Sequence, residues 1–109
     1  MKVENTKAQM RKGFLEMITL LIISEKESYP SDIIKKLKEN KLIVVEGTMY
    51  PLLTRLKNAG FLSYNWKESS SGPPRKYYSL TESGQDFLGE LTETWNGLKN
   101  AVESLSKTK

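Results

Sequence analysis

Apolar residues recur at three- and four-residue steps near the start of the chain, which is the helical period. They predict a first helix over residues 6–24. Leu20, Ile22 and Ile23 widen its apolar surface towards the end, beyond the periodic stripe of Met10, Phe14, Met17, Ile18 and Leu21. A helix that is apolar on more than one side is buried on more than one side. We therefore expect a second subunit to cover part of it.

The next apolar pattern predicts a second helix over residues 30–40. Pro30 is acceptable in a first helical turn, where its missing N–H has no intrahelical partner. Its apolar side chains, at Ile33, Ile34 and Leu37, are expected to face inward. Its lysines, Lys35, Lys36 and Lys38, are expected to face outward. Residues 42–45 are short and mostly β-branched, so they are either a small strand or an extended link.

A third helix is predicted to begin between residues 46 and 48 and to end at Gly60, because glycine is a common helix stop. Pro51 is expected in its first turn. The inward stripe consists of Leu52, Leu53 and Leu56, and the remaining faces carry Thr48, Tyr50, Thr54, Arg55 and Lys57. Two helices joined by a short link are typical of a helix-turn-helix.

Residues 62–68 and 75–80 alternate and are rich in aromatic residues, which favours two strands. One of Tyr77 and Tyr78 should face inward and the other outward. Residues 69–74 form a Ser-, Gly- and Pro-rich loop that we expect to be too long for a tight hairpin. A helix followed by such a wing indicates a winged helix-turn-helix, in which one helix enters the DNA major groove and the wing touches the backbone.

The last predicted helix starts after Thr81, a good N-cap, with acidic Glu82 in its first turn. Its apolar residues are spaced three and four apart, as in a coiled-coil seam. We expect them to form a dimer interface: Leu88, Leu91, Trp95, Leu98, Val102 and Leu105. The predicted fold is thus mainly α with a small β-hairpin. A DNA-binding unit over residues 1–80 and a dimerisation helix over 81–109 pack together as one globular body.

Charged residues are unevenly distributed along the chain. Residues 1–80 hold 14 Lys and Arg against 8 Asp and Glu, whereas residues 81–109 hold 3 against 5. A basic surface attracts a polyanion in a salt-sensitive way. Charge alone favours a solvated lysine-rich surface, but the basic part coincides with the winged-helix pattern, and this overlap reverses the preference. We expect DNA contacts from Thr48, Tyr50, Thr54, Arg55, Lys57, Lys67, Arg75 and Lys76. Tyr50 could instead pack on the wing, and Lys57 could be solvated.

Catalysis is poorly supported, because the 109-residue chain contains no His and no Cys. It also lacks a nucleophile elbow, a phosphate-binding glycine loop and a cluster of metal ligands. Asp32 and Asp86 are isolated on polar faces. We expect no enzyme, catalytic residue, metal or cofactor. The absence of cysteine suits a reducing cytoplasm, and residues 17–23, the longest apolar run, are too short to span a bilayer. No signal peptide is recognisable, so a cytoplasmic protein is expected.

Two motifs together resemble the PadR family of bacterial transcriptional regulators. The first is the run GTMYPLL from Gly47 to Leu53, followed by Arg55-Leu56 and Ala59-Gly60. The second is PRKYY from Pro74 to Tyr78, followed by Leu80-Thr81-Glu82 and Gly84. The resemblance covers the chain from about Met10 to the last helix and is closest to short members with a single C-terminal helix. It implies a homodimeric regulator, usually a repressor, that binds a palindromic operator.

The same resemblance implies that the last helix packs against the first helix of the other subunit. Trp95 matches a tryptophan that, in some members, stacks against flat aromatic ligands in a pore at the dimer centre. The neighbours expected around such a pore are Met10, Gly13, Phe14, Met17, Lys99 and Val102. Multidrug-binding relatives carry an acidic residue at the position that Lys99 occupies in this chain. The lysine would favour anionic aromatic ligands, or it could simply point to solvent. Packing without a ligand stays the simpler interpretation of Trp95.

Two other classes of function remain open. One is a sensor in which binding of a drug or phenolic compound is the main event. The other is a winged helix that serves only as a protein-interaction module. Dimerisation without salt-dependent affinity for DNA would distinguish the second from a regulator.

Overall fold

The computed structural model describes residues 1–107. In that range the chain forms four helices and one antiparallel hairpin, which confirms the mainly helical winged fold. In chain order the elements are α1 (Val3–Glu25), α2 (Pro30–Glu39), α3 (Glu46–Asn58), β1 (Leu62–Ser69), β2 (Gly72–Leu80) and α4 (Glu82–Ser106). The last two residues of the predicted 81–109 unit lie outside the described residues.

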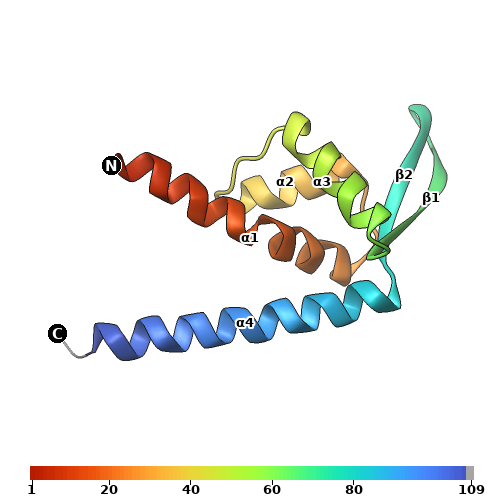
Figure 1. Cartoon of the computed structure of the whole chain (residues 1–109). Helices are drawn as coiled ribbons and strands as arrows, with labels where there is room; N and C mark the ends of the chain where they lie inside the picture. The colour runs from red at the N-terminus through yellow and green to blue at the C-terminus, as the bar shows by residue number, and fades with distance from the viewer. Residues whose placement is uncertain (108–109) are drawn as a thin grey trace.

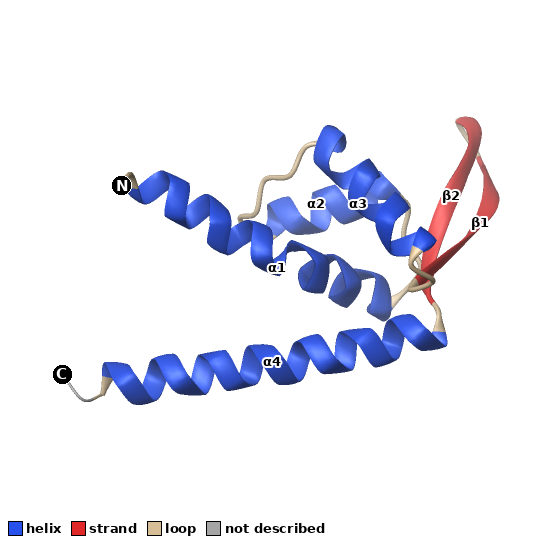
Figure 2. Cartoon of the chain, viewed as in Figure 1, coloured by secondary structure: helices blue, strands red, loops and turns tan. Residues whose placement is uncertain are grey.

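The helices and the hairpin are arranged so that the wing and the chain ends lie far apart. Figure 1 shows α1, α2 and α3 grouped together, the hairpin projecting at one end, and α4 running back along α1. Both ends of the described chain therefore lie at the end opposite the wing. Figure 2 shows the hairpin standing off the helical body. The result is an elongated molecule with extents of 56 × 31 × 22 Å.

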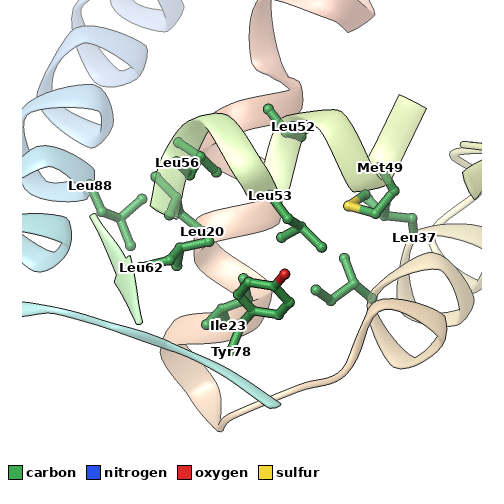
Figure 3. Packing of buried hydrophobic residues seen from close by; sticks show 11 residues of the cluster. Leu20, Ile23, Leu37, Met49, Leu52, Leu53, Leu56, Leu62, Tyr78 and Leu88 are labelled. Atoms are coloured by element: carbon green, nitrogen blue, oxygen red, sulfur yellow. The ribbon is translucent and has the colours of Figure 1, made fainter. Parts of the chain in front are cut away.

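One apolar core holds α1, α2, α3, the base of the wing and the start of α4 together (Figure 3). The predicted inward positions of α2 and α3 are confirmed, and α3 adds Met49, which the pattern had not singled out. The buried members are Leu20, Ile23, Ile33, Leu37, Met49, Leu52, Leu53, Leu56, Leu62, Tyr78 and Leu88. Because α3 contributes residues on consecutive turns, its opposite face is fixed towards solvent.

The prediction for the first helix was right in type and partly wrong in detail. The helix starts at Val3 rather than at residue 6. Met10 and Leu21, expected inward, are 62% and 42% exposed. Thr19, Leu20 and Ile23 are buried instead. Every residue from 1 to 13 is exposed, so the single chain leaves the first half of this apolar stripe, with Met10, uncovered. Leu21 points away from the face on which Leu20 and Ile23 are buried.

The structure decides the conformation of the link before α3 and corrects the expected position of Pro51. Residues 42–45 form an extended link and no strand. Pro51 lies inside α3, beyond the first turn in which we expected it. A proline there removes the N–H that would bond to the carbonyl of Gly47. That loss is tolerable because Gly47 is exposed, so water can satisfy its carbonyl group.

The wing is tighter than the sequence predicted. Its strands pair with Leu62 opposite Leu80 and Trp66 opposite Lys76. The expectation of a long loop over residues 69–74 was wrong, since β2 already begins at Gly72 and includes both prolines. Pro73 and Pro74 fall beside the irregular register between Lys67 and Ser69. Prolines are accepted in strands at edges and bulges, where a ladder N–H is not needed.

The end of α3 is joined closely to the start of α4. Gly60 stops α3 in the left-handed conformation, with φ of 87°. Thr81 caps α4 as predicted, because its hydroxyl accepts from the Gly84 N–H at 3.0 Å and donates to the Gly60 carbonyl at 2.6 Å. The rings of Phe61 and Phe87 stack with their centres 4.1 Å apart. The two helices therefore meet in a fixed joint.

Candidate nucleic-acid interface

The outward face of α3 presents all five of its predicted DNA-contact residues. Each of Thr48, Tyr50, Thr54, Arg55 and Lys57 is exposed. Seven residues make about two helical turns, so Thr48 and Arg55 share one flank of α3, and Tyr50 and Lys57 share the other. The outer face lies between these flanks and contains Thr54.

The flank with Tyr50 and Lys57 meets the wing. The Lys57 ammonium lies 5.8 Å from the centre of the Tyr64 ring. Burial raises the pKa of the Tyr78 phenol, and the nearby phenols of Tyr64 and Tyr50 raise it further. Three phenol groups from α3 and both strands therefore converge here. Tyr50 approaches the wing, yet it remains 49% exposed and accessible from outside.

Lys76 extends this surface along the wing. Its ammonium lies 4.5 Å from the ring centre of Tyr64 and 5.4 Å from that of Trp66. Such distances allow attraction between the cation and the ring faces. Lys76 is thus held on the side of the wing that faces α3.

Lys67 and Arg75 lie on the opposite side of the wing. The Arg75 guanidinium lies 4.6 Å from the centre of the Tyr29 ring. Lys67 lies 5.2 Å from the ring centre of Tyr77 and forms an ion pair with Glu27. The structure therefore brings Lys76 next to α3 and separates it from the other two predicted cations. Their contacts with DNA remain predictions.

The chemistry available on α3 is that of hydroxyl and cationic groups. The Thr54 hydroxyl donates to the backbone carbonyl of Tyr50 at 3.0 Å. Its oxygen lone pairs remain available to accept from a base amino group. Arg55 can donate to phosphate or to a guanine edge. The surface can therefore bind the backbone and has donors and acceptors suited to base edges.

Sequence reasoning missed two features of this surface. Trp66 counted only among the aromatic residues that favour a strand over residues 62–68, yet it is 61% exposed on the wing. Gly47 was noted only as part of a motif, yet a methyl group there would meet no atom within 4 Å. The two-residue alternation of the strand could have placed Trp66 on the same face as Tyr64. The helical period could likewise have placed Gly47 on the outer face of α3, seven residues before Thr54.

An apolar groove lies between α1, the 42–45 link and α4, and it reaches the start of α3 at Thr48. Its volume is about 820 Å³, and its walls include four residues of the predicted pore: Met10, Phe14, Met17 and Trp95. Phe14 and Trp95 meet edge to face, with ring centres 5.2 Å apart. The other predicted pore residues, Gly13, Lys99 and Val102, are exposed and do not line the groove within this chain.

The predicted interface residues of α4 divide into two groups. Leu88 is buried and Leu91 half-buried within the chain itself. From Trp95 onward the seam is exposed, with Leu98 exposed to 52%, followed by Val102 and Leu105. The first half of α4 therefore packs on its own core, while the second half presents an apolar stripe.

Residues 1–107 contain no group of three or more His, Cys, Asp and Glu side chains placed to hold a metal ion. None of the helices in that range is long and apolar enough to cross a membrane.

The geometry of the chain is similar to that of known regulators. Residues 19–90 match the model of the transcriptional regulator PadR-like family. A PadR-like transcription factor from Bacteroides fragilis is 58% identical, covers 93% of this chain and 98% of its own, and superposes with a TM-score of 0.79. A PadR-like regulator from Bacillus cereus is 39% identical over 89% of this chain and 95% of its own, with a TM-score of 0.80. A PadR family regulator from Eggerthella lenta is 31% identical over 98% and 94%, with a TM-score of 0.87.

Proposed function

Because the chain belongs to the PadR-like family of transcriptional regulators, we propose that it acts as a cytoplasmic repressor without catalytic activity. As a homodimer it binds a palindromic operator through α3 and the wing. The observation that carries this proposal is the continuous surface from Tyr50 and Lys57 to Lys76. It joins the exposed face of a helix to a cationic wing, as winged-helix docking on a duplex requires.

Electrostatics supports the same face. The excess of Lys and Arg lies within residues 1–80, which include α3 and both strands. Cations of this kind release counterions from the phosphate backbone, so affinity should fall steeply with salt. The exposed hydroxyls of Thr48 and Tyr50 add hydrogen bonds that position the protein.

Dimerisation is supported by what the single chain leaves uncovered. The second half of α4 exposes Leu98 and Val102, and the first half of α1 exposes Met10. A stripe of this kind on a small domain is best explained by a second copy of the chain. Two-fold symmetry would then present two α3 helices to successive turns of the duplex.

The second part of the proposed function is regulation by a small aromatic effector. The α1–α4 groove combines the rings of Phe14 and Trp95 with two cationic residues, Arg11 and Lys12. Aromatic walls favour flat ligands, and the cations favour an anionic one such as a phenolic acid. Binding would release the operator by shifting the relative placement of the two α3 helices.

The DNA-binding part is tested by selecting duplexes from a random pool and then titrating the selected duplex with salt. We expect an inverted repeat and a steep salt dependence. Arg55→Ala combined with Lys76→Ala should abolish binding while the dimer persists. The matched control is Lys2→Ala with Lys7→Ala, which removes two cations from the exposed N-terminal end of the chain. Unchanged affinity in the folded Arg55/Lys76 variant would reject this DNA face. A dimer with no salt-dependent affinity would favour the interaction module instead.

The dimer is tested with Trp95→Ala in sedimentation equilibrium. Loss of a buried interface aromatic should weaken association by about 2–4 kcal/mol. Asn96→Ala, an exposed neighbour on the same helix, is the control and should leave the dissociation constant unchanged. A Trp95→Ala protein that dimerises as tightly as wild type would show that Trp95 is not an interface anchor.

The effector is tested through the emission of Trp95 in Trp66→Phe protein, where it is the sole tryptophan. Titration with a phenolic acid should quench Trp95 more strongly than titration with a cationic planar dye. Addition of the phenolic acid should then lower operator affinity. Equal or absent quenching would exclude the groove as a site for anionic aromatics.

A further inference from the structure

Trp66 emerges from the core along one face of the wing. On β1 this face carries Leu62, Tyr64 and Trp66 in alternation, and their side chains are buried, half-buried and 61% exposed respectively. The hydrophobic contribution of a side chain scales with the area it buries, so most of the indole does little for the fold. Large aromatics in exposed positions are typical of surfaces that contact another molecule.

A cation without a carboxylate partner lies over this aromatic surface. Lys76 is opposite Trp66 in the hairpin, and its ammonium approaches the rings of both Trp66 and Tyr64. No carboxylate oxygen among residues 1–107 lies within 4.0 Å of it, whereas Lys67 on the other face is paired with Glu27. An ammonium has three donors, so contact with ring faces leaves it able to bind a phosphate.

The Trp66–Lys76 surface is continuous with α3. Tyr64 connects this surface to α3. Its ring meets that of Trp66 edge to face, with the ring centres 6.2 Å apart, and it also lies beneath the ammonium of Lys57 on α3. A duplex seated on α3 would therefore meet the wing on the side of Trp66 and Lys76. Its backbone presents apolar sugar C–H groups and anionic phosphates, which complement an indole and an ammonium without a carboxylate partner.

We infer that Trp66 and Lys76 form a backbone-clamping pair of the wing, in which the indole packs on the sugar–phosphate backbone and the ammonium binds an adjacent phosphate. The inference rests on the proposed function and deepens it, since it adds a neutral aromatic contact to a set of cations and hydroxyls. The competing interpretation is that Trp66 only covers the Lys76 stem and stiffens the hairpin.

Tryptophan fluorescence tests the contact between Trp66 and DNA in wild-type protein, where the indole is still present. The chain has two tryptophans, so the difference between wild type and Trp66→Phe isolates the emission of Trp66. A mixed-sequence duplex at low salt is the probe, because backbone contacts do not need the operator. We expect the duplex to quench Trp66 and to protect it from acrylamide, and added salt to reverse both effects.

Affinity and salt dependence separate the two members of the pair. Binding of a fluorescein-labelled duplex is measured by anisotropy over a range of salt concentrations. Trp66→Ala should weaken binding about tenfold with the salt slope unchanged, because an indole neutralises no phosphate. Lys76→Gln should weaken binding and lower the slope by about one. Asn65→Ala, an exposed neighbour on the same strand, is the control and should stay within about twofold of wild type.

Thermal unfolding establishes that each variant is folded. The inference is overturned if folded Trp66→Ala binds the duplex as tightly as wild type, or if the duplex leaves Trp66 emission and acrylamide access unchanged. It is also overturned if Asn65→Ala loses as much affinity, because general damage to the wing would then explain the effect. Absence of any duplex binding by wild type would be a failure of the proposed function itself, and that result is distinct from the others.

Discussion

Gly84 packs against the backbone carbonyl of Phe61 so closely that any side chain at position 84 would collide with it. The contact fixes the first turn of α4 against the end of α3. The capping hydroxyl of Thr81 and the stacked rings of Phe61 and Phe87 reinforce the same joint. The helix proposed to read DNA and the helix proposed to hold the dimer are thereby set at one angle. Movement between subunits would be transmitted to α3 rather than absorbed by a hinge.

Gly84→Ala should therefore destabilise the protein. The added methyl group meets backbone rather than a flexible side chain, so the start of α4 must shift. We expect the free energy of unfolding to fall by about 1–3 kcal/mol in urea titration, the usual cost of overpacking. Gly89→Ala is the matched control, because a methyl group there meets no atom within 4 Å. It should be neutral or slightly stabilising. Equal stability of the two variants would contradict the tight joint.

Gly47→Ala should separate stability from DNA affinity. The position lies in the first turn of α3, is exposed and has open space for a methyl group. Replacing glycine by alanine in a compatible helical site stabilises by about 0.4–1 kcal/mol. The same methyl group would obstruct close approach of a DNA backbone, which glycine permits. Urea titration and anisotropy with the selected duplex check the two effects. Undiminished affinity would mean that DNA does not approach this turn.

Thr19→Val should stabilise the protein. Thr19 is fully buried in α1, and its hydroxyl oxygen has no hydrogen-bond partner among residues 1–107. A buried unsatisfied polar group costs about 1–3 kcal/mol, and valine has nearly the same shape. We expect a rise of about 1 kcal/mol in the free energy of unfolding. Thr92→Val, which removes a hydroxyl bonded to the Leu88 carbonyl at 2.9 Å, should bring no such gain. A loss of stability in Thr19→Val would contradict the assignment of an unsatisfied hydroxyl.

Stability should fall at high pH because of Tyr78. Burial raises the pKa of its phenol above the ordinary value of 10.0. The unfolded chain therefore releases this proton at lower pH than the folded chain does. The contribution is fully present below pH 10 and is lost as the pH rises through the folded pKa. Tyr78→Phe should flatten the decline of unfolding free energy above pH 10. An equally steep decline in that variant would assign the effect to other groups.

The sequence predicted most of the fold because periodicity is a local signal. The buried positions of α2 and α3, the Thr81 cap and the Gly60 stop all follow from short stretches of chain. Periodicity does not say which part of an apolar stripe a neighbour covers. For this reason Met10 was expected inside and is exposed.

The candidate site was predictable as a set of residues and less so as an arrangement. Exposure of the five α3 residues followed from the leucine stripe. The separation of Lys76 from Lys67 and Arg75 depends on strand register, which fixes the face of each side chain. The position of Arg75 over Tyr29 depends on how the wing docks against the helices, whereas that of Lys76 over Tyr64 is a contact between the two strands. That docking is a tertiary property and leaves no pattern in the sequence.

The prolines of the wing have a consequence for how copies of the chain meet. A two-stranded hairpin has two outer edges, and that of β2 is paired with Ser28 at Tyr78, near the base of the wing. Unpaired backbone groups on the rest of such edges recruit strands from other molecules. Pro73 and Pro74 cannot donate hydrogen bonds and interrupt the regular ladder of β2. Strand addition and amyloid-like stacking at this edge are therefore discouraged. The wing is in this way guarded against self-association along the edge formed by β2.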